Sequence, residues 1–190
     1  MGTSGNDTIV GTAGPDVIAA GGGDDTVNGL GGDDTICGEE GDDSLSGDSA
    51  NDTLRGGAGN DSITGGGGDD DISGGAGNDS INASGGNDRA AGDEDRDEIS
   101  GGDGTDVVAG GDGNDVLNGG AGNDHVEGND GDDRVVGGPG GDTLEGNKGV
   151  DNLDAVDSPA GADTLNGGAE TDVCFSDPGD TPASLTGGDC

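Results

Sequence analysis

Aromatic and basic residues are almost absent from this chain of 190 residues. It contains one phenylalanine, Phe175, no tryptophan or tyrosine, and five lysine and arginine residues against 43 aspartate and glutamate residues, for a formal net charge of −38. Such acidity argues against a nucleic-acid or anionic-lipid partner and favours cations. Only 25% of the residues are apolar. Low hydrophobicity with high net charge is typical of a chain that does not fold in water alone.

Several other features are missing. No apolar run approaches the ~20 residues that a helix needs to cross a bilayer, and no basic stretch followed by an apolar one marks an export signal at the start. Three cysteines, Cys37, Cys174 and Cys190, allow at most one internal disulfide. The one histidine, His125, has no second histidine and no nucleophile placed near it. We expect a surface residue there and no enzyme activity in the chain.

Glycine is abundant instead, with 49 residues, and it recurs in a nine-residue repeat. The clearest stretch, residues 56–82, consists of GGAGNDSIT, GGGGDDDIS and GGAGNDSIN. Each unit has glycine at places one, two and four, aspartate at place six and an apolar residue at place eight. A fixed short period decides the architecture of the whole chain. The unbroken register also argues against the alternative of a flexible acidic linker.

The repeat predicts how the chain is divided. Residues 2–154 form seventeen units without a slip of register. Three added residues, including Pro159, precede two further units in residues 155–175. Residues 176–190 are expected to be a non-repeating tail that caps the last coil, fastened by a Cys174–Cys190 disulfide; the alternative is a buried thiol and a frayed end. Cys37 is expected to face outward.

Each unit predicts a six-residue glycine loop followed by a three-residue strand at places seven to nine. In residues 62–64 polar, apolar and polar side chains alternate, so that only Ile63 faces a core. The glycine density excludes a helix. Strands of three residues are too short to stand alone, so neighbouring units are expected to stack in parallel as a solenoid.

The motif GGxGxD followed by an apolar place resembles the RTX (repeat-in-toxin) calcium-binding nonapeptide repeats, over roughly residues 2–175. This resemblance implies an all-β fold, a right-handed parallel β-roll in which two units form one coil of a two-sheet β-solenoid. It also implies rows of calcium ions between successive glycine-rich loops. At the usual strand spacing of ~4.8 Å, nineteen units would give a rod about 45 Å long.

By the same resemblance the calcium ligands are loop carbonyl oxygens and the sixth-place carboxylates. The sixth-place aspartates are Asp7, Asp16, Asp25, Asp34, Asp43, Asp52, Asp61, Asp70, Asp79, Asp88, Asp97, Asp106, Asp115, Asp124, Asp133, Asp142, Asp151, Asp163 and Asp172. Some loops depart from the pattern, with Ala50 or Glu170 at place four and a rewritten stretch at residues 93–96.

The residue types suit calcium, a hard cation that takes six to eight oxygen ligands. No histidine or cysteine recurs with the repeat, which argues against zinc. Neighbouring carboxylates ~4.8 Å apart repel by about 0.9 kcal/mol even in water. About seventeen calcium ions would bring ~34 positive charges and offset most of the net charge.

We therefore expect a secreted, extracellular and monomeric calcium-binding module that folds on binding several ions and has no catalysis of its own. The alternative is a calcium-dependent secretion and folding domain of a larger secreted enzyme or toxin, whose catalytic domain lies outside these 190 residues. A third possibility, a surface binder that uses the flat sheet, is disfavoured because the outward residues form no regular threonine row. The sequence does not identify a protein or surface partner.

Overall fold

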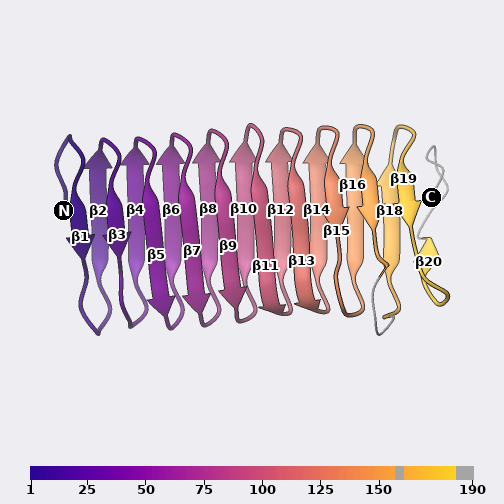
Figure 1. The fold of residues 1–190 in the computed structure, drawn as a ribbon, viewed down its shortest axis with the longest axis horizontal. Helices are drawn as coiled ribbons and strands as arrows, with labels where there is room; N and C mark the ends of the chain where they lie inside the picture. The colour runs from indigo at the N-terminus through magenta and orange to yellow at the C-terminus, as the bar shows by residue number, and fades with distance from the viewer. Residues whose placement is uncertain (157–160, 183–190) are drawn as a thin grey trace.

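The computed structural model describes residues 1–156 and 161–182. These residues form a flattened rod of two ten-stranded parallel sheets, and the chain crosses to the other sheet after every strand (Figure 1). In Figure 1 the odd-numbered strands run down in front and the even-numbered strands run up behind as the chain advances, so the coil is right-handed. The described residues contain no helix, and thus none that could span a membrane. The predicted two-sheet parallel β-solenoid is confirmed.

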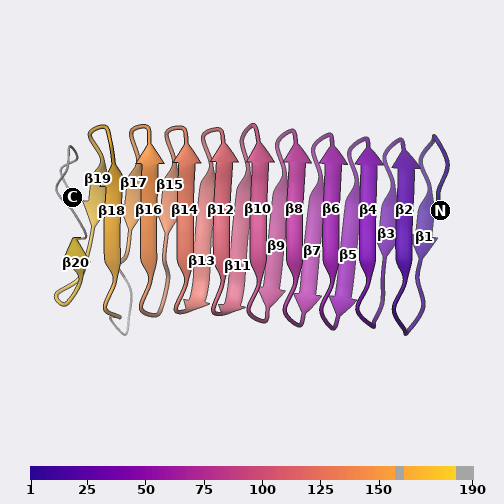
Figure 2. The ribbon, with the colours of Figure 1, turned by 180° about the vertical axis from the view of Figure 1, so that it is seen from behind.

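The two sheets are formed by alternate strands. The first contains β1 (Thr8–Val10), β3 (Thr26–Asn28), β5 (Ser44–Ser49), β7 (Ser62–Gly67), β9 (Ser80–Gly85), β11 (Glu98–Gly104), β13 (Val116–Gly122), β15 (Arg134–Val136), β17 (Asn152–Asp154) and β19 (Val173–Phe175). The second, in front in Figure 2, contains β2 (Val17–Gly22), β4 (Thr35–Glu40), β6 (Thr53–Ala58), β8 (Asp71–Ala76), β10 (Arg89–Glu94), β12 (Val107–Asp112), β14 (His125–Asp130), β16 (Thr143–Lys148), β18 (Thr164–Gly168) and β20 (Thr181–Pro182).

One coil of the rod contains two nonapeptide units. Ile63 on β7 therefore pairs with Ile81 on β9, eighteen residues later, and the same offset holds for most of the chain. After the added residues the offset becomes 21, as in the pairing of Leu144 with Leu165, and the register continues. Residues 157–160, which include Pro159 of the insertion, lie outside the described residues.

Many strands are longer than the predicted three residues. In β7, for example, pairing continues from Ser62 through Gly67, into the first three places of the following unit. Burial alternates along it, with Ile63 and Gly65 facing inward. The backbone pairs this far because each coil stacks on a nearly identical one, and backbone hydrogen bonds do not depend on the side chains. The observed loops are therefore shorter than the six residues predicted from the sequence.

The core is a narrow row of eighth-place side chains between the sheets. Ile36, Leu54, Leu117 and Leu144 are fully buried, and small residues such as Ala83 are buried at place one. Ile9 and Cys174, in the first and last strands of the first sheet, are only partly buried against this core. One large apolar side chain per nine residues is a small core for a rod of this length.

The C-terminal part holds one strand that the sequence analysis did not foresee. The strand β20 lies in the predicted non-repeating tail and pairs in register with β18, where Thr164 is opposite Thr181. Cys174 on β19 is disulfide-bonded and Cys37 is free. The predicted partner Cys190 and the rest of the predicted capping tail, residues 183–190, lie outside the described residues.

Candidate metal centre

The glycine loops lie along the two long edges of the rod, and a sixth-place aspartate ends each loop. Hydrogen bonds between coils arrange these aspartates in two rows. The upper row in Figure 1 contains Asp7, Asp25, Asp43, Asp61, Asp79, Asp97, Asp115, Asp133, Asp151 and Asp172. The lower row contains Asp16, Asp34, Asp52, Asp70, Asp88, Asp106, Asp124, Asp142 and Asp163.

One carboxylate oxygen of these aspartates fastens each loop to the loop before it. The backbone N–H of Asp61 donates to Oδ1 of Asp79 at 2.8 Å, and that of Asp70 donates to Oδ1 of Asp88 at 2.8 Å. The same bond recurs along both rows. It holds each carboxylate in one orientation, with one oxygen toward the preceding coil.

The other carboxylate oxygen, Oδ2, has no such partner in most coils. It is buried without a hydrogen bond in every sixth-place aspartate from Asp25 to Asp133, and in Asp151 and Asp172. These residues are at most 3% exposed. Leaving a buried polar group unsatisfied costs about 1–3 kcal/mol, and more when the group is charged. Among the described residues, these buried oxygen atoms therefore have no positively charged partner.

Backbone carbonyl oxygens surround the same space. A Cβ atom on Gly38, at place one, would lie 2.2 Å from Oδ2 of Asp43 and 2.5 Å from the carbonyl oxygen of Gly56 in the next coil. Cβ atoms on Gly57 and Gly59, at places two and four, would each lie 2.2 Å from a carbonyl oxygen of the preceding coil. The missing side chains thus leave room for oxygen atoms to converge between coils.

This set of oxygen atoms fits calcium. Carboxylate and carbonyl oxygens are the ligands that calcium takes, in flexible geometry. Within the described part of the chain, no group of three or more His, Cys, Asp or Glu side chains is close enough to hold a metal ion. A site here must therefore draw much of its coordination from the backbone, which suits calcium and does not suit zinc.

Burial also raises the pKa of many sixth-place aspartates. Desolvation is the largest cause, the hydrogen bond from the backbone amide opposes it, and in most of these sites nearby aspartates add to it. The pKa reaches about 7 for Asp97 and Asp133, and about 6 for Asp61, Asp70, Asp79, Asp88 and Asp151. A bound cation would favour the charged form of these carboxylates and reverse this effect.

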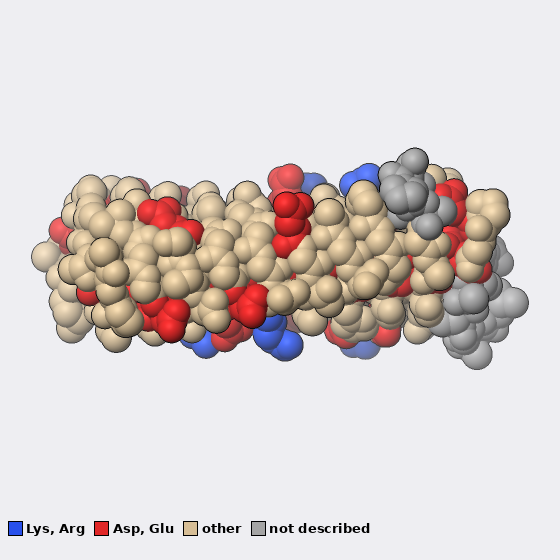
Figure 3. All heavy atoms as spheres, turned by 90° about the horizontal axis from the view of Figure 1, so that it is seen from below, with Lys and Arg blue, Asp and Glu red and all other residues tan. Residues whose placement is uncertain are grey.

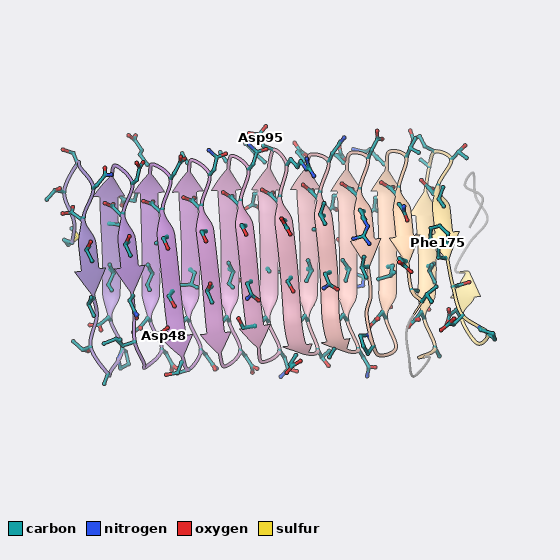
Figure 4. All side chains as sticks on the ribbon, in the orientation of Figure 1. Asp48, Asp95 and Phe175 are labelled. Carbon is teal, nitrogen blue, oxygen red and sulfur yellow. The ribbon has the colours of Figure 1, made fainter. Side chains whose placement is uncertain are left out.

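Loops that depart from the repeat keep the same arrangement. In the rewritten loop 92–97, Oδ1 of Asp97 accepts a hydrogen bond from Asp79 at 2.8 Å, and Oδ2 is buried without a partner. Asp95, at place four, has a φ of 73°, which is positive like that of the fourth-place glycines, such as Gly59 at 136°. Asp48, at place two, also has a positive φ, 72°, and Figure 4 shows Asp48 and Asp95 at opposite edges of the rod.

A second row of hydrogen bonds was not predicted from the sequence. At place five, the backbone N–H of Asn78 donates to Oδ1 of Asn60 at 3.0 Å, and that of Asn87 donates to Oδ1 of Asp69 at 2.8 Å. In the sequence, the only sign of this row of hydrogen bonds was the frequent Asn or Asp at place five, directly before the sixth-place aspartate. These bonds run opposite to the sixth-place ones and join the loops without a metal ion.

Burial of the aspartates also explains the surface of the rod. Figure 3 views the lower loop edge, and most of the surface in this view is neither acidic nor basic.

His125 lies on β14 with its side chain 35% exposed, and its Nε2 atom is 2.5 Å from Oε1 of Glu127. This position agrees with the predicted surface residue.

Comparison with known protein families identifies the repeat. The family model described as RTX calcium-binding nonapeptide repeat (4 copies) matches residues 1–36, 38–72, 46–81, 64–99, 82–117, 100–135, 109–144, 127–155 and 160–181. The matches cover nearly the whole chain, and the repeat module is all that they detect in it. No curated protein matches the chain.

Proposed function

This chain belongs to the RTX calcium-binding nonapeptide repeat family, and from that membership we propose that it is a secreted module whose β-roll folds on binding several calcium ions. The observation that carries the proposal is the buried Oδ2 atom of the sixth-place aspartates, which has no hydrogen-bond partner in most coils. When bound, calcium supplies the positive charge and the multiple coordination that these oxygens lack.

The proposed ligands are the sixth-place aspartates from Asp25 to Asp172 together with loop carbonyl oxygens. In each loop Oδ1 holds the register with the preceding coil, which leaves Oδ2 to face the ion. The glycines at places one, two and four keep the carbonyl oxygens close by, because a Cβ atom would displace them. The eighth-place side chains pack between the two sheets and form the hydrophobic core beside the loops.

Energetics support a fold that depends on calcium. Neighbouring carboxylates in a row repel by about 0.9 kcal/mol per pair at the dielectric constant of water, and more when they are buried. The row of core side chains is too narrow to offset this repulsion together with the ordering of a glycine-rich chain. Extracellular calcium modules bind at ~10⁻⁴–10⁻³ M, so the roll would fold outside the cell and remain unfolded at cytosolic calcium levels.

We propose a structural or binding role without catalysis. His125 is paired with Glu127 on an open sheet face, and the repeated aspartates are better explained as metal ligands than as acid–base groups.

The test is far-UV circular dichroism of the purified chain. In excess EDTA we expect the spectrum of a disordered chain, and on addition of millimolar calcium a cooperative change to a β spectrum. Magnesium should be a poor substitute, because it requires a smaller, near-octahedral site and releases water reluctantly. A complete β spectrum in excess EDTA would show that the proposal is wrong.

A further inference from the structure

The first coil of the rod satisfies its aspartates in a different way from the coils that follow. Oδ2 of Asp7 accepts hydrogen bonds from the backbone N–H of Thr3 at 2.6 Å and from its hydroxyl group at 2.8 Å. Oδ2 of Asp16 accepts the same two bonds from Thr12, at 2.6 and 3.0 Å. The oxygen that is buried and unpartnered in Asp25 or Asp34 therefore has two donors here.

The two threonines also close their own loops. The hydroxyl oxygen of Thr12 lies 3.1 Å from the carbonyl oxygen of Gly14, and that of Thr3 lies 3.3 Å from the carbonyl oxygen of Gly5. Each hydroxyl group thus lies between a sixth-place carboxylate and a fourth-place carbonyl, two kinds of oxygen that also surround the later sites. It has one proton to share between them.

The backbone of these loops differs as well. From Gly21 to Asn147, each second-place residue has a positive φ, whether it is glycine or, for example, Leu30 at 78°. Residues 1–19, all of which the structure describes, include no positive φ. Threonine is β-branched and disfavours the left-handed region. Thr3 and Thr12 therefore select a loop conformation in which their own amide and hydroxyl groups reach the carboxylate.

The last described loop satisfies its aspartate in a comparable way. Asp180 precedes β20 and stands where a sixth-place aspartate would stand. Its Oδ1 accepts a hydrogen bond from the backbone N–H of Asp163 at 3.3 Å, as in the rows, and its Oδ2 accepts one from the backbone N–H of Asp177. Both carboxylate oxygens of Asp180 have donors from the chain itself.

We propose that the chain itself replaces calcium at both ends of the described roll. Asp7, Asp16 and Asp180 take no calcium ion, whereas the unpartnered aspartates between them do. The physical reason is that an ion between loops needs oxygen atoms from both sides, and among the described residues β1, β2 and β20, which follow these three aspartates, each have a neighbouring strand on one side only. The strand β19 is also at an end, but Oδ2 of Asp172 has no donor of this kind and is counted with the interior sites. Donors from the chain hold the end loops in shape, so that the outermost ions bind against preformed loops. The inference rests on the proposed function for the interior sites.

The test is the number of calcium ions bound at saturation, measured by native mass spectrometry and equilibrium dialysis. The double variant Asp7→Ala/Asp16→Ala is expected to bind as many ions as the unchanged chain, and so is Asp180→Ala. The matched control is Asp61→Ala/Asp70→Ala, one interior site in each row, which is expected to lose at least two ions. Loss of two ions from the Asp7→Ala/Asp16→Ala variant would overturn the proposal.

A second measurement tests the threonines directly. In the calcium-loaded protein, Thr3→Val/Thr12→Val removes both hydroxyl groups and keeps the side-chain shape. We expect amide hydrogen exchange in residues 2–19 to become about fivefold faster, as for the loss of one hydrogen bond per loop, with an unchanged number of ions. The control Thr26→Val/Thr53→Val, on outward strand positions, should leave exchange in residues 2–19 unchanged. Unchanged exchange in the Thr3→Val/Thr12→Val variant would overturn the role of the hydroxyl groups.

The two proposals fail in different ways. If the unchanged chain binds no calcium, the proposed function is wrong. If it binds calcium and the end variants lose ions, only the present inference is wrong. Should Asp61→Ala/Asp70→Ala fail to fold, Asp61→Ala alone serves as the interior control, and the ion count of the end variants still decides the question.

Discussion

At single positions in the loops, the choice of residue is restricted more by the backbone conformation than by side-chain contacts. From Gly21 to Gly149 the residues at the second and fourth places have a positive φ, which glycine adopts freely and other residues adopt at a cost of about 1–2 kcal/mol. Ala50, at place four with φ 84°, is a clear case because it has no functional group of its own. Such positions are sites of local strain in an otherwise regular array.

We therefore predict that Ala50→Gly stabilises the calcium-loaded roll by about 0.5–1 kcal/mol, since relief of strain exceeds the added entropy of the unfolded chain. The measurement is denaturant unfolding in saturating calcium. The matched control is Ala58→Gly at place three, where φ is not positive; this variant should lose about 0.5–1 kcal/mol. Equal effects of the two substitutions would contradict the explanation by strain.

The buried carboxylates predict how the metal-free chain responds to pH. In the metal-free roll burial raises the pKa of Asp97 and Asp133 to about 7 and that of Asp61 to about 6, above the ordinary value of 3.8. A folded-state pKa above the unfolded one means that protonation stabilises the fold. This contribution is complete below pH ~4 and is lost as the pH rises through about 6–7.

A calcium-stripped sample should therefore gain β structure by circular dichroism as the pH falls from about 8 to about 4. In the loaded protein the trend is opposite, because protons compete with calcium for the same carboxylates, and calcium affinity should fall below about pH 7. Sedimentation velocity distinguishes folding from aggregation. Metal-free β content that stays constant or decreases on acidification would contradict the prediction.

At the scale of one strand, the core contains a single file of large side chains and no second layer to compensate for a loss. Leu117 on β13 is fully buried between the sheets, whereas its neighbour Val116 faces outward and is partly exposed. We predict that Leu117→Ala destabilises the calcium-loaded roll by about 2–5 kcal/mol. Val116→Ala, in the same strand, should change the stability by no more than about 0.5 kcal/mol.

Denaturant unfolding in saturating calcium checks both values, and the calcium midpoint should rise for Leu117→Ala alone. Because each coil contacts only its neighbours, amide exchange should accelerate most in the strands that pair with β13, namely β11 and β15. Comparable losses for the two variants would show that the eighth-place row is not the core.

At the scale of the whole molecule, calcium is expected to change the dimensions of the chain. Ten strands per sheet at ~4.8 Å spacing give a rod about 43 Å long. An unfolded chain of this length has a radius of gyration of about 47 Å, and one with this net charge extends further by self-repulsion. We predict that small-angle X-ray scattering shows a decrease to below about 20 Å on addition of millimolar calcium. A compact form in EDTA would contradict the prediction.

The sequence by itself determined the architecture, because the repeat is local and nearly identical units can bury their single apolar residue only by stacking. The register of Ile63 with Ile81 and the inward position of Asp70 follow from the spacing of nine residues and from alternation along a strand. The resemblance to the RTX repeats rests on the same repeat: its glycines, its sixth-place aspartate and its eighth-place apolar residue. Even the irregular loop that ends at Asp97 kept its position, since its neighbours on both sides impose the coil.

Only the tertiary structure decided how each carboxylate oxygen is satisfied. The partner of Oδ1 lies one coil away, and the donor to Oδ2 depends on the φ of a second-place residue, so neither is visible in a linear pattern. Thr3 and Thr12 look like imperfect repeats in the sequence, yet their hydroxyl groups bind the carboxylates of Asp7 and Asp16. Asp180 lies in what the repeat predicted to be a tail, and it joins the row because β20 pairs with β18. Contacts of this kind come from loop conformation and from stacking, which the nine-residue period does not encode.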